Sequence, residues 1–256
     1  MSLSLRSRPS ALTIPPTERT AASIVVTDAT KVIEGVTVLD RVSFSALPGR
    51  VTAFLGPNGA GKSSTLRAIL GIDHLTSGSA TIGGRPFHEH ARPAQVAGAL
   101  LTPDAVHPQR TARGHLAVVA ASNGLPRWSV DKTIELVGIA DIAELPAGQM
   151  SLGMRQRLGL ATALIGEPAV VILDEPHNGL DAAAIRWLRV VLRQLADSGR
   201  TVLLSSHLMP EIELVSDDVV VIYEGTVRAA CTLAEFVGTS PRIPLEDRYL
   251  DLVGGA

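Results

Sequence analysis

Three glycines, a lysine and a pair of serines fall within one short stretch, FLGPNGAGKSSTLRAIL (residues 54–70). Glycines so close together cost chain entropy, but they let consecutive backbone N–H groups turn inward and form a nest for an anion. The spacing fits Gly-x-x-x-x-Gly-Lys-Ser, in which Lys62 reaches the β- and γ-phosphates of a nucleotide and the Ser63 hydroxyl ligates Mg²⁺. We therefore expect the phosphates to lie against one contiguous set of residues: Gly56, Pro57, Asn58, Gly59, Ala60, Gly61, Lys62, Ser63 and Ser64.

The elements on either side decide between a nucleotide loop and a glycine-rich turn that carries a surface lysine. The stretch RVTAFLG, which leads into the motif, predicts a short buried strand, and residues 62–70 have helical composition. A helix that begins at this point adds the positive end of its dipole to the nest. The order strand, loop, helix favours the nucleotide interpretation.

Two acidic residues follow a second apolar strand, because AVVILDE places Asp174 and Glu175 directly after the apolar residues VVIL. We expect Asp174 to anchor Mg²⁺, directly or through water, and Glu175 to orient or deprotonate an attacking water. His207 lies just past a third apolar strand, TVLLSS. Ligands of open α/β sheets bind at the carboxyl ends of the strands, so Gly56, Asp174 and His207 should converge. The alternatives are polar residues that simply end a strand and a structural histidine.

The spacing of these residues predicts a lobe inserted within a larger domain. More than a hundred residues separate Lys62 from Asp174, whereas a bare βαβ unit takes about thirty. Short segments with strand-like sequences fill residues 23–56. Residues 92–166 contain segments that predict helices, each ending at a glycine or a proline. The expected organisation is a disordered segment over residues 1–22, a nucleotide-binding domain over 23–238 with the helical lobe at about 92–166, and a C-terminal tail over 239–256.

The composition narrows the class of protein. With 256 residues, 46% of them hydrophobic, the chain is long enough for one large core. A net charge of −2 and 3% aromatic residues do not favour a nucleic-acid partner. The single cysteine, Cys231, excludes an internal disulfide and fits a reducing compartment. No apolar run approaches the ~20 residues that span a bilayer, and the N-terminal arginines have no apolar core behind them, so we expect no signal peptide.

Four motifs, in this order and spacing, resemble those of the nucleotide-binding subunit of an ATP-binding cassette (ABC) transporter: GPNGAGKSS, SLGMRQRLGLATAL, VVILDEPHNGLD and LLSSHLM. The resemblance covers about residues 23–237 and is greatest to bacterial exporter ATPases of the multidrug and antibiotic-resistance type. It implies an α/β P-loop NTPase fold of the ABC type, with an antiparallel β edge and an inserted helical subdomain. It also implies that the chain binds ATP and Mg²⁺.

The resemblance also assigns roles to particular residues. The glycine loop with Lys62 would be the Walker A motif, Asp174 the Walker B magnesium residue, Glu175 the catalytic glutamate and His207 the switch histidine that senses the γ-phosphate. Asp181, in the segment NGLD, would be the communication aspartate at a dimer seam; without the family, NGLD is a plain turn and helix cap.

The family signature Leu-Ser-Gly-Gly-Gln falls on MSLGM. Ser151 and Gly153 are kept, whereas Leu152 and Met154 replace glycine and glutamine. Because Ser151 opens a helix, its hydroxyl and the following N–H groups are placed to meet a partner's phosphate, although an ordinary helix cap also explains the serine.

Two positions depart from the family pattern. The aromatic residue that usually stacks on adenine is replaced at Ile33 or nearby, and no Phe, Tyr or Trp occurs before Phe44. The glutamine that usually faces Mg²⁺ and the membrane subunit is replaced by Thr102, with Asp104 close by. Neither departure removes the residues expected to carry the chemistry.

The resemblance implies an ATPase subunit that powers a separately encoded permease, exporting a drug or another small molecule. One loop and one signature require a second ATPase chain, most simply a homodimer, at the cytoplasmic face of a bacterial plasma membrane. The alternatives are a soluble ABC ATPase of translation or DNA repair, which usually carries tandem cassettes or a long coiled-coil insertion, and a regulatory module that does not hydrolyse ATP. Glu175 and His207 count against the regulatory module.

Overall fold

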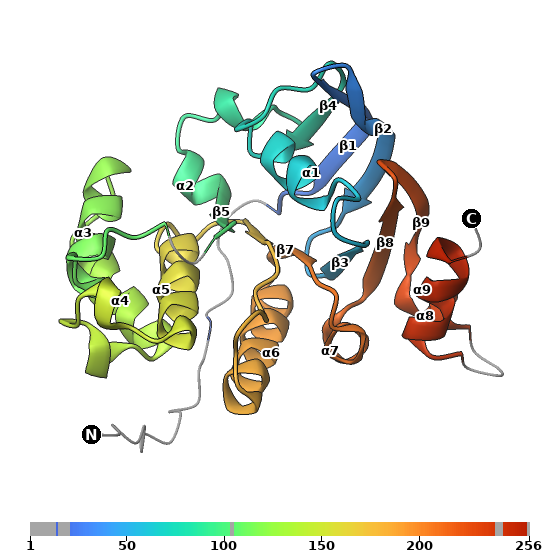
Figure 1. The fold of residues 1–256 in the computed structure, drawn as a ribbon. Coiled ribbons are helices and arrows are strands. Elements are labelled where there is room, and N and C mark those ends of the chain that lie inside the picture. Colours follow the sequence, from blue (N-terminus) through green and yellow to red (C-terminus); the bar gives the residue numbers. More distant parts are fainter. Residues whose placement is uncertain (1–13, 15–20, 103–104, 239–242, 255–256) are drawn as a thin grey trace.

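A six-stranded sheet runs through the middle of the molecule in the computed structural model, which describes residue 14 and residues 21–102, 105–238 and 243–254 (Figure 1). Its strand order is β5-β6-β7-β3-β8-β9, and all neighbours are parallel except β8 and β9. The strands are β3 (Val51–Leu55), β5 (Ala97–Leu100), β6 (Val170–Leu173), β7 (Thr201–Ser205), β8 (Asp218–Tyr223) and β9 (Thr226–Thr232). Every residue of β3, β6 and β7 is buried, as expected for parallel strands covered on both faces.

A second, three-stranded antiparallel sheet has the order β2-β1-β4. It consists of β1 (Ile24–Ile33), β2 (Val36–Ala46) and β4 (Ser77–Ile82). The two sheets share the core through β3, whose side chains alternate between the two faces. Val51, Ala53 and Leu55 pack into the cluster formed mainly with the helices, whereas Phe54 packs into the cluster formed with β1, β2 and β4.

The helices α3 to α9 form three groups around the sheets, whereas α1 lies beside the antiparallel sheet and α2 lies near β5. In Figure 1, α3, α4 and α5 lie together at one end of the molecule, α6 and α7 lie below the central sheet, and α8 and α9 lie beyond β9. The helices are α1 (Lys62–Ile69), α2 (Pro93–Val96), α3 (Ala112–Ser122), α4 (Trp128–Val137), α5 (Leu152–Leu164), α6 (Ala182–Asp197), α7 (Met209–Val215), α8 (Leu233–Val237) and α9 (Leu245–Val253), with short 3₁₀ turns at Phe87–Glu89, Ala140–Ile142 and Ala147–Gln149.

The predicted α/β class with an antiparallel β edge is confirmed. The stretch predicted to be helical also contains β5, which joins the central sheet beside β6. Its sequence, AGAL, has no strand periodicity. Its place depends on α5, since a Cβ at Gly98 would lie 1.7 Å from the Ala163 carbonyl oxygen. Only glycine permits so close an approach of helix to strand.

The strand β9 and the helix α9 are among the elements that were not predicted. β9 pairs with β8 through a two-residue turn, Glu224–Gly225, in which both residues have positive φ, the geometry of a tight hairpin. The same Glu-Gly pair joins β1 to β2, so the dipeptide was a turn signal present in the sequence. The helix α9 lies within the segment predicted as a tail, and most of the N-terminal segment, residues 1–13 and 15–20, lies outside the described residues.

Candidate nucleotide-binding site

The glycine loop between β3 and α1 has the backbone geometry that an anion nest requires. Gly59 and Gly61 have φ of 81° and 105°, a region that side chains disfavour. A Cβ at Gly56 would lie 2.4 Å from the Ile222 carbonyl oxygen on β8. Gly61 is the N-cap of α1, and among the described residues no side chain caps this helix by a hydrogen bond. Its first N–H groups therefore point into the loop, ready for an anion.

Lys62 is held inside this loop. Its ammonium donates hydrogen bonds to the carbonyl oxygens of Gly56 at 2.7 Å and Pro57 at 3.3 Å, and the side chain is only 7% exposed. The same Nζ lies 3.7 Å from Oε1 of Glu175. The positive charge is thereby fixed between the glycine loop and the acidic residue at the end of β6.

Asp174 joins the loop to the central strands. The Ser63 hydroxyl donates to Asp174 Oδ2 at 2.7 Å, and the Ser205 hydroxyl donates to Asp174 Oδ1. Ser205 also accepts a hydrogen bond from the backbone N–H of Glu175 at 2.9 Å. Ser205, the last residue of β7, thus orients both acidic residues; the sequence analysis did not identify it. A serine hydroxyl and a carboxylate side by side are hard oxygen donors of the kind that Mg²⁺ takes.

Glu175 is held between two cationic or titratable groups. Its Oε2 accepts a hydrogen bond from Nδ1 of His207 at 2.7 Å, while Oε1 faces Lys62. Its backbone φ is 48°, which is unusual for a residue with a side chain and is typical of functional sites. The arrangement leaves a carboxylate beside the cleft with a fixed orientation, which is what a residue that positions a water molecule or accepts its proton needs.

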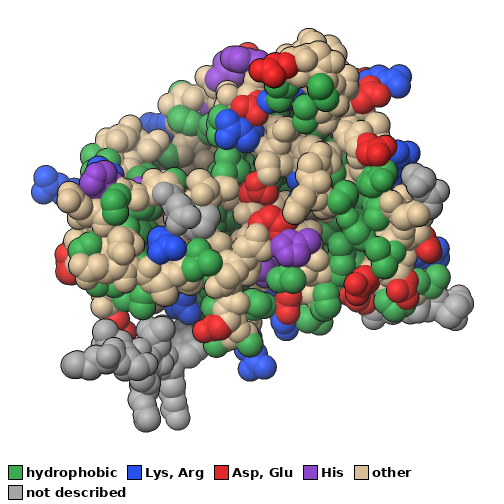
Figure 2. Space-filling view, in the orientation of Figure 1, with side chains coloured by type: hydrophobic (Ala, Val, Ile, Leu, Met, Phe, Trp, Pro, Cys, Tyr) green, Lys and Arg blue, Asp and Glu red, His purple; other side chains and the backbone are tan. Residues whose placement is uncertain are grey.

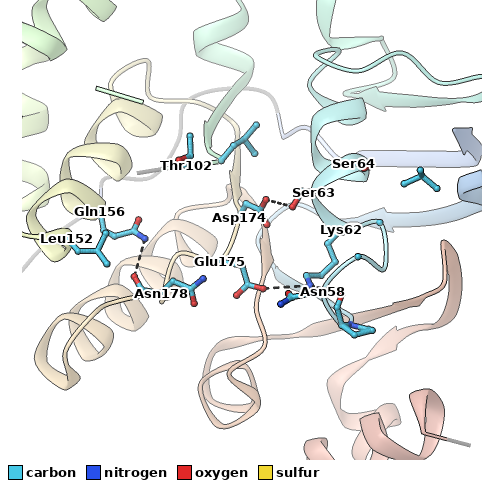
Figure 3. A pocket seen from close by; sticks show the side chains of 15 residues that line it. Asn58, Lys62, Ser63, Ser64, Thr102, Leu152, Gln156, Asp174, Glu175 and Asn178 are labelled. Atoms are coloured by element: carbon cyan, nitrogen blue, oxygen red, sulfur yellow. Dashed lines mark hydrogen bonds and ion pairs between the residues drawn. The ribbon is translucent and has the colours of Figure 1, made fainter. Parts of the chain in front are cut away.

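A cleft of about 520 Å³ opens in front of these residues. Figure 3 shows Lys62, Ser63 and Asn58 on one side of it, and Leu152, Gln156 and Asn178 on the other. Thr102 lies at the edge, from the segment that follows β5. In the space-filling view, acidic and histidine side chains gather at the middle of this face, between the α3–α5 group and the β-rich side (Figure 2).

The structure brings together most, but not all, of the residues predicted for the site. Seven of the nine predicted loop residues line the cleft with Asp174 and Glu175, and His207 contacts Glu175. The other two, Gly56 and Ala60, belong to the loop but do not line this cleft. The residues predicted from the signature and from NGLD do not line the cleft themselves, although Leu152 and Asn178, from the same two segments, do. Ser151 is the N-cap of α5 and accepts from the Met154 N–H at 3.3 Å; Asp181 is the N-cap of α6 and accepts from the Ala184 N–H at 2.8 Å. Gly153 lies in the first turn of α5.

The two departures from the family pattern have different surroundings. Ile33 lies at the end of the β1–β2 hairpin with 45% of its surface exposed, and Val38 on β2 is the apolar residue from this hairpin that lines the cleft. Thr102 lines the cleft as predicted for its position, whereas Asp104 lies outside the described residues. Val38, Gln156 and Asn178 also line the cleft and were not predicted. Gln156 and Asn178 lie within two of the motifs that carry the family resemblance, SLGMRQRLGLATAL and VVILDEPHNGLD, so this position was the signal that could have found them.

A buried histidine lies behind the acidic residues. His177 is 2% exposed, and its Nδ1 lies 3.5 Å from the Ser206 hydroxyl, which accepts from the Leu208 N–H. Burial lowers the pKa of His177 to about 4, and Glu211 opposes this shift while the charges of His207 and Arg189 add to it. His177 is therefore neutral at physiological pH and packs as an uncharged group between the loop after β6 and the loop after β7.

Comparison with known proteins agrees with this geometry. The family model described as "ABC transporter" matches residues 39–178. The chain is 39% identical over 201 residues to the uncharacterized ABC transporter ATP-binding protein YhcH of Bacillus subtilis, covering 77% of this chain and 66% of YhcH. It is 36% identical to the lantibiotic transport ATP-binding protein SrtF of Streptococcus pyogenes (75% and 82% covered) and 40% identical to Nod factor export ATP-binding protein I of Burkholderia pseudomallei (73% and 64% covered).

The fold is also similar to a solved structure titled "Structure of ATP binding subunit of ABC transporter". The two superpose with a TM-score of 0.80 at 26% sequence identity, over 90% of this chain and 98% of the other. The chain thus matches nearly all of that structure, but spans less than two thirds of two of the relatives named above, YhcH and the Nod factor export protein.

Proposed function

This chain belongs to the ABC transporter family as an ATP-binding subunit, and from this premise we propose that it hydrolyses ATP to power a separately encoded permease that exports a drug or another small molecule. The family match confirms the resemblance and the class of transport ATPase predicted from the motifs. Export and a small antibiotic-like cargo are supported by relatives named for lantibiotic transport and Nod factor export.

The observation that carries the proposal is the placement of Glu175 beside the glycine loop. Lys62 and the open N-terminus of α1 would bind the β- and γ-phosphates of ATP. Glu175, fixed by Lys62, His207 and Ser205, would orient a water molecule at the γ-phosphate and accept its proton. His207 would hold Glu175 in this orientation and sense the γ-phosphate from the same position.

Ser63 and Asp174 fit the magnesium ion that the family implies, since both are oxygen donors and they already lie 2.7 Å apart. When bound, Mg²⁺ would neutralise charge on the phosphate oxygens. The role of Ser205 is to keep Asp174 turned toward Ser63.

A second copy of the chain is proposed because Ser151, Gly153 and Asp181 lie at helix N-termini and do not line the cleft of their own chain. In a head-to-tail dimer, each signature would complete the ATP site of the other chain. Among the described residues, no helix is long and apolar enough to cross a bilayer. We place the dimer as a peripheral assembly on its permease, at the cytoplasmic face of a bacterial plasma membrane.

The test uses Glu175→Gln, which keeps the size and shape of the side chain but removes its charge and its basicity. ATP affinity should stay at the wild-type level, turnover should be almost completely lost, and light scattering should show a dimer trapped by ATP. Glu135→Gln, at an exposed position on α4, is the matched control and should behave as wild type. A Glu175→Gln protein that stays monomeric and hydrolyses ATP normally would contradict both the dimer and the role of Glu175.

A further inference from the structure

The first residue of α5 occupies the space that a side chain at position 179 would need. A Cβ built on Gly179 would lie 1.9 Å from Cδ2 of Leu152 and 2.9 Å from its Cγ. Gly179 also has a φ of 71°, in the region that favours glycine. Leu152 therefore lies directly over the backbone of the loop that follows β6, and any larger residue at 179 would displace it.

A hydrogen bond and a near approach also join the first two turns of α5 to the same loop. Gln156, buried at 5% exposure and one turn further along α5, donates from Nε2 to the Asn178 carbonyl oxygen at 3.4 Å. A Cβ at Gly153 would lie at an ordinary contact distance of 3.7 Å from Leu180. Figure 3 shows Leu152 and Gln156 beside Asn178 on one wall of the cleft. Three successive loop residues, 178–180, thus meet the first two turns of α5.

The loop links this contact to the proposed chemistry. It runs from Glu175 to Asp181, and it is folded by backbone hydrogen bonds from Asn178 N–H to the Glu175 carbonyl and from Leu180 N–H to the His177 carbonyl. Asp181 then caps α6. A shift of the α5 N-terminus must therefore move a short, internally bonded loop whose first residue is Glu175.

We propose that Leu152 and Gly179 interlock α5 with the 175–181 loop, so that the position of Ser151 is passed to Glu175 within one chain. This inference rests on the proposed function, since it makes hydrolysis at Glu175 depend on where the signature helix lies. Leu152 is a positioning residue: it acts through the loop. In this chain, leucine at the first signature glycine position has a partner that glycine would not contact.

The experiment is a double-mutant cycle in the full-length protein, with kcat, the KM for ATP and ATP binding measured for each variant. Leu152→Ala should lower kcat about fivefold, while ATP binding stays within about twofold, because the phosphate loop is on the other wall. Gly179→Ala should lower kcat about tenfold, since it displaces Leu152 and also strains φ. The double variant should lose about tenfold, rather than the roughly fiftyfold expected of independent sites.

Two controls separate the interlock from general damage. Gly124→Ala adds a methyl group at a φ of 62° with no atom of the described residues within 4 Å, so it carries the backbone strain without the contact and should leave kcat unchanged. Leu152→Met keeps a long apolar side chain and should stay within about twofold of wild type. This variant and Leu152→Ala change a residue that is partly exposed, so they remain informative if Gly179→Ala fails to fold.

Fold-changes that multiply in the double variant, or a Leu152→Ala protein with wild-type kcat, would overturn the interlock while leaving the proposed function intact. If the Glu175→Gln protein instead hydrolyses ATP at the wild-type rate, the proposed function and the interlock are both wrong.

Discussion

The N-termini of α1 and α5 lie on opposite walls of one cleft. They differ in whether a side chain accepts a hydrogen bond from the backbone N–H groups of the first turn. α1 follows Gly61, and within the described residues no side chain caps it. α5 follows Ser151, whose hydroxyl already accepts from the Met154 N–H. The first helix end is thus open to an anion, whereas the second satisfies part of its own hydrogen-bonding need.

The difference shows how the two ends suit different tasks. Lys62, folded against the loop carbonyls, adds a full charge to the open end of α1, so this wall has all the groups needed to hold phosphate by itself. The bond that caps α5 is 3.3 Å long, beyond the usual N–H···O range, so the Ser151 hydroxyl is weakly held. The cap uses this hydroxyl as an acceptor, so its O–H can still donate to a phosphate oxygen of ATP bound by a second chain.

The largest effect is expected on the α1 wall. Lys62→Ala removes a buried charge that the loop is built around, and ATP binding should weaken at least about a hundredfold, or roughly 2.7 kcal/mol. Hydrolysis should be lost with it. Equilibrium binding of a fluorescent ATP analogue and phosphate release measure the two effects. The control is Lys132→Ala, which changes an exposed lysine paired with Glu167 on the helical side. If Lys62→Ala binds ATP as tightly as wild type, the α1 wall does not hold phosphate through Lys62.

The next effect concerns the pH dependence of stability at the base of the 175–181 loop. The native pKa of His177 is about 4, against 6.5 ordinarily, so the unfolded chain takes up a proton between these values and the native chain does not. Stability is therefore lost as the pH falls from about 6.5 to about 4, and this residue alone should cost about 2 kcal/mol between pH 7 and pH 4.5. Glu211, His207 and Arg189 are the charged or titratable neighbours that modify this shift.

Urea unfolding of His177→Gln at pH 7 and pH 4.5 tests this assignment. The variant should lose less stability on acidification than wild type by about the same 2 kcal/mol, because glutamine does not titrate. His74→Gln changes an exposed histidine and should leave the pH dependence as it is. Equal pH dependence in His177→Gln and wild type would mean that His177 titrates normally.

The smallest effect is expected at the N-terminus of α5, which Ser151 caps. It tests most directly how this helix end differs from the open N-terminus of α1. Ser151→Ala should lower the free energy of unfolding by about 1 kcal/mol through loss of the cap. It should leave ATP binding to the isolated chain within about twofold and reduce hydrolysis about tenfold, since the hydroxyl would meet nucleotide only in the proposed dimer. Binding and turnover measured on one preparation separate these effects; a parallel loss of both would place Ser151 in the site of its own chain.

Much of the α1 wall could be predicted from the sequence because its groups are contiguous. The run from Gly56 to Ser64 carries its own turn chemistry, and a strand and a helix adjoin it directly. Asp174 and Glu175 could be assigned because they end an apolar strand, and the carboxyl ends of parallel strands share one edge of a sheet. Local backbone geometry and hydrophobic periodicity determine all of these features.

Only the tertiary structure determines the contacts between segments that are distant in the chain. Ser205 bonds to Asp174 from a neighbouring strand, Gln156 reaches the Asn178 carbonyl from a helix, and Leu152 lies over Gly179. None of these residues has a sequence context that names its partner, since each contact depends on how α5 and β7 pack against β6. β5 was missed for the same reason: the four residues AGAL become a strand because they lie beside β6 and beneath α5, where Gly98 allows the helix to approach. Local backbone preferences depend on residues that are neighbours in the sequence, so they can be predicted from it. Contacts between distant elements depend on how all the elements pack in the folded core.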